Sequence, residues 1–160
     1  GIAIMAVREG LSFESEIQSD SAPVWGSVEK ILKAGIEIHC MRDLTRGGLS
    51  SALNEIASCS KVGIRIFEDR IPIQDQVRGW CDVLGFDPLH VANEGKLIAI
   101  VMRDHAEAVL SNMKSNAQGR QSAIIGEVIS EHPGRVIMKT NVGGHRIVDM
   151  LSGEQLPRIC

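Results

Sequence analysis

The stretch that decides the fold is Asp43-Leu44-Thr45-Arg46-Gly47-Gly48-Leu49, which follows an apolar run over residues 36–40. That run alternates apolar with polar side chains, which is the period of a half-buried strand. From Leu49 onward, apolar residues recur at Leu53 and Ile56, which is the spacing of one face of a helix. The stretch is therefore predicted to be a turn where a strand leads into a helix.

This turn contains residues suited both to starting a helix and to binding an anion. We expect Asp43 or Thr45 to cap the free N–H groups of the first helical turn. Gly47 and Gly48 allow positive φ, or let another backbone or a phosphate approach closely. Arg46 adds a positive charge beside them. Two interpretations stay open at this point, a simple helix start or an anion site.

The rest of the chain mixes helical and strand patterns. Helices are expected over residues 24–34, 49–59, 73–84 and 104–115, and strands over residues 36–40, 63–67, 97–102, 123–129, 135–138 and 145–148. Residues 97–102 are apolar without alternation, as in a central strand buried on both faces. The turn between the strands at 123–129 and 135–138 is expected at His132-Pro133-Gly134. The order of elements favours an α+β fold, a mixed sheet covered by helices, over a pure doubly wound fold.

Length and composition limit the kind of protein. The 160 residues, 44% hydrophobic and 23% charged, suit one globular domain with a real core. The net charge is −3 and no stretch concentrates Lys and Arg, so a nucleic-acid partner is not expected. Apolar runs are too short to span a bilayer and no signal peptide is apparent, which predicts a cytoplasmic protein without a membrane partner.

The ends of the chain suggest how it is organised. Residues 1–150 are expected to form the domain, and residues 151–160 a flexible tail rich in small and polar residues. The chain starts at Gly1 without a methionine and passes at once into an apolar run, which we interpret as a fragment of a longer protein.

Cysteines and histidines give no support for a metal site. The four cysteines, Cys40, Cys59, Cys81 and Cys160, form no C-x-x-C pair, and we expect the first three to be buried thiols. The five histidines show no H-x-x-x-H or H-E-x-x-H spacing. We therefore expect no bound metal.

Two other positions carry groups that could do chemistry. Glu94 lies at the expected entry to a buried strand, where a carboxylate can have a raised pKa and act as a general base. The alternative is a turn in which Asn93 and Glu94 satisfy nearby backbone groups. Cys160 is the last residue of the tail, so its thiol could reach a site and carry a substrate, or it could be incidental.

Four motifs together resemble a known family. They are residues 43–49, Asp87-Pro88-Leu89, Ala92-Asn93-Glu94-Gly95-Lys96 and the terminal Pro157-Arg158-Ile159-Cys160. The set resembles the C-terminal half of the HypE family of hydrogenase maturation proteins. The motifs before the tail also resemble, more loosely, the superfamily of aminoimidazole ribonucleotide synthetase and selenophosphate synthetase. The terminal tetrapeptide distinguishes the HypE family, and the resemblance extends over essentially the whole chain.

The resemblance implies a fold, a reaction and partners. The family has two α/β domains, and this chain is similar to the second, the C-terminal domain. The absent N-terminal domain would supply most ATP and Mg²⁺ ligands and the homodimer interface of the full-length parent. In that family the carbamoyltransferase HypF loads the terminal cysteine, and ATP drives dehydration of the S-carboxamide to a thiocyanate. The cyanide passes to the iron of NiFe hydrogenase, with a HypC–HypD complex as partner.

Carried over by resemblance, the family's roles fall on residues of the same motifs. Cys160 would carry the substrate, and Glu94 would be the base, oriented by Asn93. Residues that would shape the cleft facing the ATP domain and help to bind phosphate are Asp43, Thr45, Arg46, Gly47 and Gly48. Two rival functions remain open, a related ATP-dependent synthetase acting on a small metabolite and a docking module for maturation partners.

Overall fold

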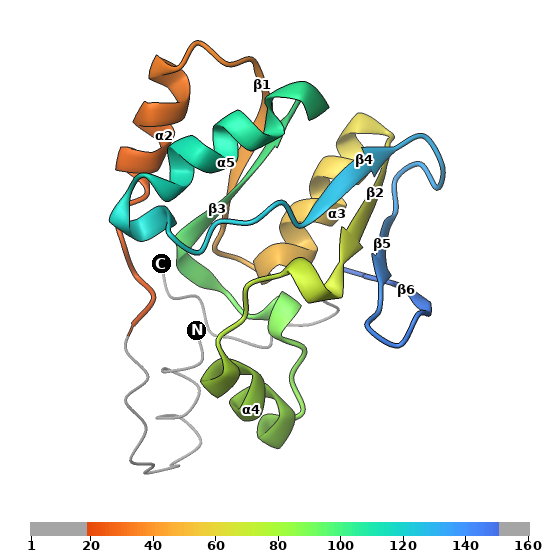
Figure 1. Ribbon diagram of the computed structural model, residues 1–160. Coiled ribbons are helices and arrows are strands. Elements are labelled where there is room, and N and C mark those ends of the chain that lie inside the picture. The colour runs from red at the N-terminus through yellow and green to blue at the C-terminus, as the bar shows by residue number, and fades with distance from the viewer. Residues whose placement is uncertain (1–18, 151–160) are drawn as a thin grey trace.

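The computed structural model describes residues 19–150, so the predictions for residues 151–160, Cys160 included, lie outside the described residues. The helices are α2 (Trp25–Lys33), α3 (Gly48–Ser60), α4 (Asp75–Leu84) and α5 (Ala106–Lys114), with short 3-10 turns η1 (Glu68–Arg70), η2 (Pro88–His90), η3 (Arg103–His105) and η4 (Ala117–Gly119). The strands are β1 (Ile38–Leu44), β2 (Gly63–Phe67), β3 (Asn93–Val101), β4 (Gly126–Ile129), β5 (Val136–Lys139) and β6 (His145–Ile147). Figure 1 shows how these elements are arranged.

The described strands form two sheets rather than the single sheet that was expected. β1 and β3 make an antiparallel pair. The second sheet has the order β4-β2-β5-β6, in which β2 and β5 are parallel and the other neighbours are antiparallel. This sheet is mixed, as predicted. The chain between β4 and β5 passes through the turn at 132–134, but the two strands lie on opposite sides of β2 rather than side by side.

Helix α3 lies between the two sheets and forms the centre of the core (Figure 1). Its apolar residues recur at helical spacing, so one face of the helix is buried against β1, β2 and β5. The core side chains are Leu44, Leu49, Ala52, Leu53, Ile56, Ala57, Ile64, Ile66, Leu89, Val136, Met138 and Val148. Helix α3, which follows β1 as predicted from the sequence, is therefore the element on which both sheets pack.

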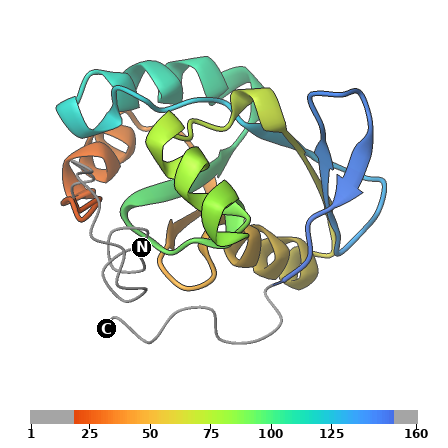
Figure 2. The ribbon, with the colours of Figure 1, turned by 90° about the horizontal axis from the view of Figure 1, so that it is seen from below.

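Two further helices pack beside each other, and a third is attached more loosely. α2 and α5 are in contact, and Lys30 of α2 donates hydrogen bonds to Ser115 at the end of α5. Figure 2 shows α4 apart from this pair, beside the chain that leads into β3. Of the α4 residues, Cys81 is buried. Among residues 19–150, none of the helices has the length and apolar character needed to cross a bilayer.

Most element predictions are confirmed, but two strands differ. β1 continues through Asp43 and Leu44 instead of ending at Cys40, because Leu44 is buried in the core and stays paired with β3. β3 starts at Asn93, and its residues are half-buried, apart from the exposed Lys96, rather than buried on both faces. The reason is that β1 is its single partner among the described strands, so β3 is not a central strand.

Candidate functional site

The pairing of β1 with β3 brings together two of the motifs that the sequence singled out. Asp43 is opposite Leu97, whereas the next residue, Leu44, is opposite Asn93. One step along β1 therefore faces four steps along β3, and residues 94–96 form a bulge. Glu94 lies in this bulge, next to the end of β1 from which the chain turns into α3.

The turn from β1 into α3 is built from two glycines in the left-handed region. Gly47, the N-cap residue, has φ +65°, and Gly48 has φ +60°. The prediction of positive φ here is confirmed, but the predicted capping is wrong. Asp43 belongs to β1, the Thr45 hydroxyl donates to the Asp43 carboxylate at 3.3 Å, and none of the side chains in residues 19–150 caps α3. Because a glycine is the N-cap residue, the first N–H groups of α3 have no side-chain oxygen from that position.

Another part of the backbone packs against these glycines. A Cβ atom at Gly48 would lie 2.6 Å from the Leu89 carbonyl oxygen and 2.5 Å from that of Val91. A Cβ atom at Gly47 would overlap the Ser51 side chain. Of the interpretations left open by the sequence, close approach of another backbone is confirmed at Gly48. Arg46 is exposed beside this turn, so its guanidinium is available to an anion.

Side chains on both sides of the bulge tie it to neighbouring segments. The Asn93 carboxamide donates to the Val91 carbonyl at 2.7 Å and accepts from the Lys96 ammonium at 2.8 Å. The Lys96 ammonium also lies 3.6 Å from the Asp20 carboxylate. Glu94 is half-buried between Asn93 and Lys96 in the chain. Asn93 therefore lies in one network with Lys96 and Asp20, to which the sequence analysis assigned no role, and Glu94 is the neighbour of Asn93 in the chain.

A third motif, Asp87-Pro88-Leu89, positions the backbone that covers Gly48. The Asp87 carboxylate caps η2 by accepting from the Leu89 N–H at 2.9 Å, and its other oxygen accepts from Arg146 at 2.6 Å. Pro88 occupies the first residue of η2, where its missing N–H costs nothing. The motif thus holds Leu89 against α3 and links this turn to β6, a contact between residues far apart in the sequence.

The last described residues are held along α3 close to the same turn. Ser50 is fully buried, and its hydroxyl donates to the Asp149 carbonyl. The Asn54 carboxamide donates to the carbonyls of Val148 at 2.8 Å and Ser50 at 2.9 Å. The chain therefore leaves the described domain beside the first turns of α3.

The expected burial is confirmed for Cys81 but is wrong for Cys40 and Cys59. Cys81 is buried, but Cys40 is half-buried and Cys59 is exposed, because Cys59 lies near the solvent-facing end of α3. Burial raises the pKa of the Cys81 thiol to about 11, and the nearby carboxylates of Asp82 and Asp87 add to the effect. A buried and protonated thiol is a poor nucleophile, so Cys81 is structural. Within residues 19–150, no three His, Cys, Asp or Glu side chains are grouped so as to hold a metal ion.

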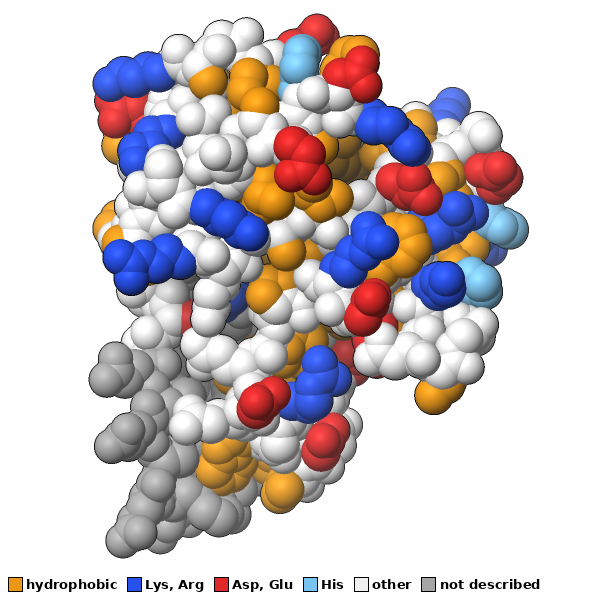
Figure 3. Space-filling view, viewed as in Figure 1, with side chains coloured by type: hydrophobic (Ala, Val, Ile, Leu, Met, Phe, Trp, Pro, Cys, Tyr) orange, Lys and Arg blue, Asp and Glu red, His pale blue; other side chains and the backbone are white. Residues whose placement is uncertain are grey.

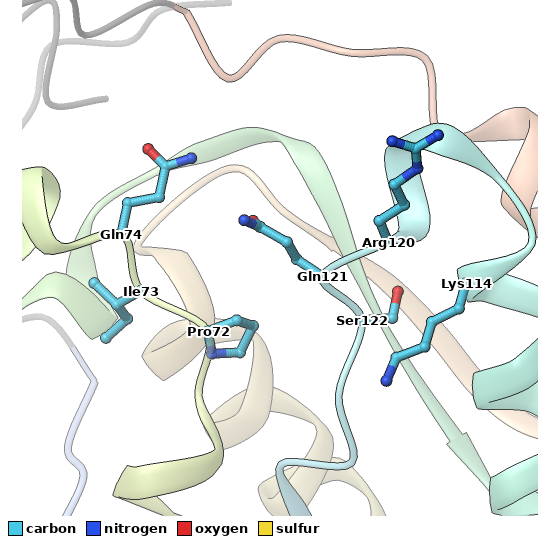
Figure 4. Close-up of a pocket in the computed structure, with 7 residues that line it drawn as sticks. All are labelled: Pro72, Ile73, Gln74, Lys114, Arg120, Gln121 and Ser122. Atoms are coloured by element: carbon cyan, nitrogen blue, oxygen red, sulfur yellow. The ribbon is translucent and has the colours of Figure 1, made fainter.

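Figure 4 shows a separate open pocket of about 320 Å³ that is lined by other residues than these motifs. Pro72, Ile73 and Gln74 line one side, and the other side is lined by Lys114 together with Arg120, Gln121 and Ser122. None of the predicted site residues contributes to it. On the face in Figure 3, acidic and basic side chains are interspersed around a band of apolar ones, so this face has no patch of one charge.

The chain is similar in sequence and in structure to known proteins. Carbamoyl dehydratase HypE of Azotobacter vinelandii is 52% identical over 160 residues, which are 100% of this chain and 47% of that relative. A crystal structure of the hydrogenase maturation protein HypE in complex with ATP matches with a TM-score of 0.92 at 44% identity, over 100% of this chain and 49% of that chain. The crystal structure of a HypE–HypF complex matches with a TM-score of 0.88 at 44% identity, over 94% of this chain and 49% of that one. The chain thus spans about half the length of these relatives.

The family assignment covers the junction of β1 and β3. Residues 1–139 match the family described as AIR synthase related protein, C-terminal domain, and this range contains both sides of the β1–β3 junction. The fold, with its mixed sheet and covering helices, is the one expected for that family. The chain belongs to the AIR synthase related protein family, as its C-terminal domain.

Proposed function

We propose that this chain is the C-terminal part of a HypE-type carbamoyl dehydratase. The full-length enzyme would convert a carbamoylated C-terminal cysteine to a thiocyanate with ATP. Support comes from the match of this chain, over all of its own length, to 47% of the length of a carbamoyl dehydratase. The structural observation that carries the proposal is the register of β1 and β3, which puts the Glu94 bulge beside the turn into α3.

The reaction requires activation of an oxygen and removal of two protons. An amide oxygen is a poor leaving group, and transfer of the γ-phosphoryl group of ATP to it makes a good one. The C–O bond then breaks, phosphate leaves, and the two N–H protons are lost as the C≡N bond forms. A base close to the amide nitrogen lowers the barrier to this step. The products are the thiocyanate, ADP and phosphate.

Residues of this chain would carry the substrate and take a proton. Cys160 would hold the carbamoyl group, and Glu94 would accept a proton from its nitrogen. Asn93 would keep the backbone next to Glu94 in place, since its carboxamide is already bonded to the Val91 carbonyl and to Lys96. Because the chain leaves the domain beside α3, a tail of ten residues, at most about 36 Å when extended, would start close to Glu94.

The turn into α3 would face the phosphate. Arg46 is exposed there, and the N-terminus of α3 has no side-chain cap, which suits a negative charge. Gly47 and Gly48 would give the turn its shape but would not surround the phosphate, because carbonyl oxygens already fill the space beside Gly48. Asp43 and Thr45, joined by a hydrogen bond, would line the same edge. Most ligands of ATP and Mg²⁺ would belong to an N-terminal domain of the full-length enzyme.

The partners follow from the same proposal. The carbamoyltransferase HypF would load Cys160, and the support for this partner is that a similar protein, HypE, forms a complex with HypF. A HypC–HypD complex would receive the cyanide. The full-length protein would be a cytoplasmic homodimer, with residues 1–150 as its C-terminal domain and residues 151–160 as its flexible tail.

The test is the intact mass of the full-length protein after treatment with HypF, before and after addition of ATP. We expect an added carbamoyl group on Cys160, followed by loss of one water with ATP. Cys160→Ala should abolish both changes. Glu94→Gln should keep the first and lose the second, whereas Glu107→Gln, at an exposed position on α5, should behave as wild type.

Three other outcomes would contradict parts of the proposal. If active HypF adds nothing to Cys160, the small-metabolite synthetase becomes the better explanation. If Cys160 is loaded but never loses water, the docking module is favoured. If Glu94→Gln dehydrates the adduct at the wild-type rate, Glu94 is not the base.

A further inference from the structure

We propose that Lys96 is the positioning residue for Glu94. Its ammonium group fixes the shape of the bulge at residues 94–96 by holding Asn93 on one side and Asp20 on the other. This inference rests on the proposed dehydratase, in which Glu94 takes the proton. Lys96 itself does not touch the reacting atoms in this proposal.

The bulge needs such a group because the β ladder cannot hold it. Leu44 pairs with Asn93 and Asp43 pairs with Leu97, so residues 94–96 are opposite no residue of β1. Backbone groups outside a ladder have no strand partner to fix their conformation. The position of Glu94 therefore depends on contacts made by side chains and by neighbouring segments.

Lys96 bridges the bulge from its end to its beginning. The ammonium is a donor only, so the oxygen of the Asn93 carboxamide must face Lys96, at 2.8 Å. The carboxamide nitrogen must then face the Val91 carbonyl, at 2.7 Å. The chemistry of the two partners sets the orientation of the Asn93 amide, and this locks the backbone immediately before Glu94.

The same bridge connects the bulge to the segment before α2. Lys96 lies 3.6 Å from the Asp20 carboxylate, and a Cβ atom at Gly95 would overlap the Asp20 carbonyl and lie 3.0 Å from the Ala22 nitrogen. Residues 20–22 therefore pack directly on Gly95. The bulge is enclosed between this segment and the Val91 carbonyl, which in turn packs on Gly48.

This role differs from a simple contribution to stability. The Lys96 side chain is 48% exposed and that of Asp20 27% exposed, and ion pairs in such positions add little to folding. A displacement of a catalytic group by about 1 Å, by contrast, can lower a rate about 100-fold. Loss of Lys96 should therefore lower the reaction rate far more than it lowers stability.

The experiment measures single-turnover dehydration of the carbamoylated full-length protein. For Lys96→Met we expect a rate about 10- to 100-fold lower, with the KM for ATP within about twofold, unchanged loading of Cys160 and an unchanged melting temperature. Lys96→Arg should recover part of the rate because it keeps the charge. Lys139→Met, at an exposed position on β5, is the matched control. Amide hydrogen exchange should become faster at residues 93–97 in Lys96→Met and stay unchanged in α3.

A second variant shows whether Lys96 acts through Asn93. In an Asn93→Ala background, Lys96→Met should cause a much smaller loss than in the wild type, because the contact between the two is already gone and only the contact of Lys96 with Asp20 is left. If the rate losses of Lys96→Met and Asn93→Ala multiply in the double variant, Lys96 acts directly on the phosphate, and the inference is overturned. An unchanged rate or unchanged exchange in Lys96→Met would overturn it too. If wild type loads Cys160 but never dehydrates it, the proposed function fails, and faster exchange at 93–97 still identifies the Lys96 clamp.

Discussion

Replacement of Gly48 by alanine tests whether the turn into α3 and the segment 89–91 form one unit. The new Cβ atom would meet the carbonyl oxygens of Leu89 at 2.6 Å and Val91 at 2.5 Å. It would also be forced into φ +60°. The left-handed conformation costs an L residue about 1–2 kcal/mol, and overpacking of a tight contact costs about 1–3 kcal/mol, so we expect a loss of roughly 2–5 kcal/mol.

The matched control is Gly35→Ala. Gly35 has nearly the same conformation, φ +67°, but a Cβ atom there meets nothing within 4 Å, so this variant should lose about 1–2 kcal/mol from backbone strain alone. Urea unfolding followed by far-UV circular dichroism gives both values, and their difference is the cost of the clash. Equal losses in the two variants would refute the reasoning, because they would mean that residues 89–91 do not pack on Gly48.

The remaining predictions concern Cys81 and Ser50. The pKa of Cys81 is raised from 9.0 to about 11, so the unfolded chain releases this proton first as the pH rises, and the free energy of unfolding should fall by about 2–3 kcal/mol between pH 9 and pH 11. Cys81→Ala should flatten that pH dependence. Equal slopes of the free energy of unfolding against pH in the wild type and in Cys81→Ala would contradict the prediction. At pH 8, a thiol reagent should modify the exposed Cys59 rapidly in the folded chain and Cys81 only after unfolding. Ser50→Ala should lose about 1–2 kcal/mol in urea unfolding, because the buried hydroxyl that donates to the Asp149 carbonyl is removed. Ser58→Ala, at an exposed position of the same helix, should lose nothing measurable, and equal effects at both sites would show that the hydrogen bond adds no stability.

Local sequence signals were sufficient for several elements. The strand at 63–67 was predicted with its observed bounds, because Ile64 and Ile66 alternate with polar residues. The end of a helix at Gly85 was also predicted, because glycine commonly follows the last residue of a helix. In the structure, Gly85 has φ +70° and terminates α4. The sequence did not reveal that the strand containing residues 97–101 pairs with one strand in the described part of the chain, because an apolar run looks the same in a central strand and in a half-covered pair.

The candidate site was predicted in parts but not as a whole. The Thr45–Gly48 turn and the Asn93–Glu94 pair were both selected from residue type and spacing. The capping prediction at Asp43 and Thr45 failed because β1 continues through Leu44, which leaves Gly47 at the helix N-terminus. Lys96 was part of a quoted motif but received no role. One local signal in the sequence could have suggested this role of Lys96. Its ammonium, which can only donate, lies close to an Asn in a run that contains glycine.

Local conformations and family membership follow from the amino-acid sequence alone, because they depend on neighbouring residues and on their identity. Gly47 and Gly48 permit left-handed backbone, the apolar spacing of residues 49–57 makes α3 amphipathic, and the whole chain matches its relatives. Which segments meet is known from the three-dimensional structure and not from the sequence. The β1–β3 register, the packing of Val91 on Gly48 and the contact of Lys96 with Asp20 join residues far apart in the chain. Their geometry follows from burial of the common core around α3, which no local pattern specifies.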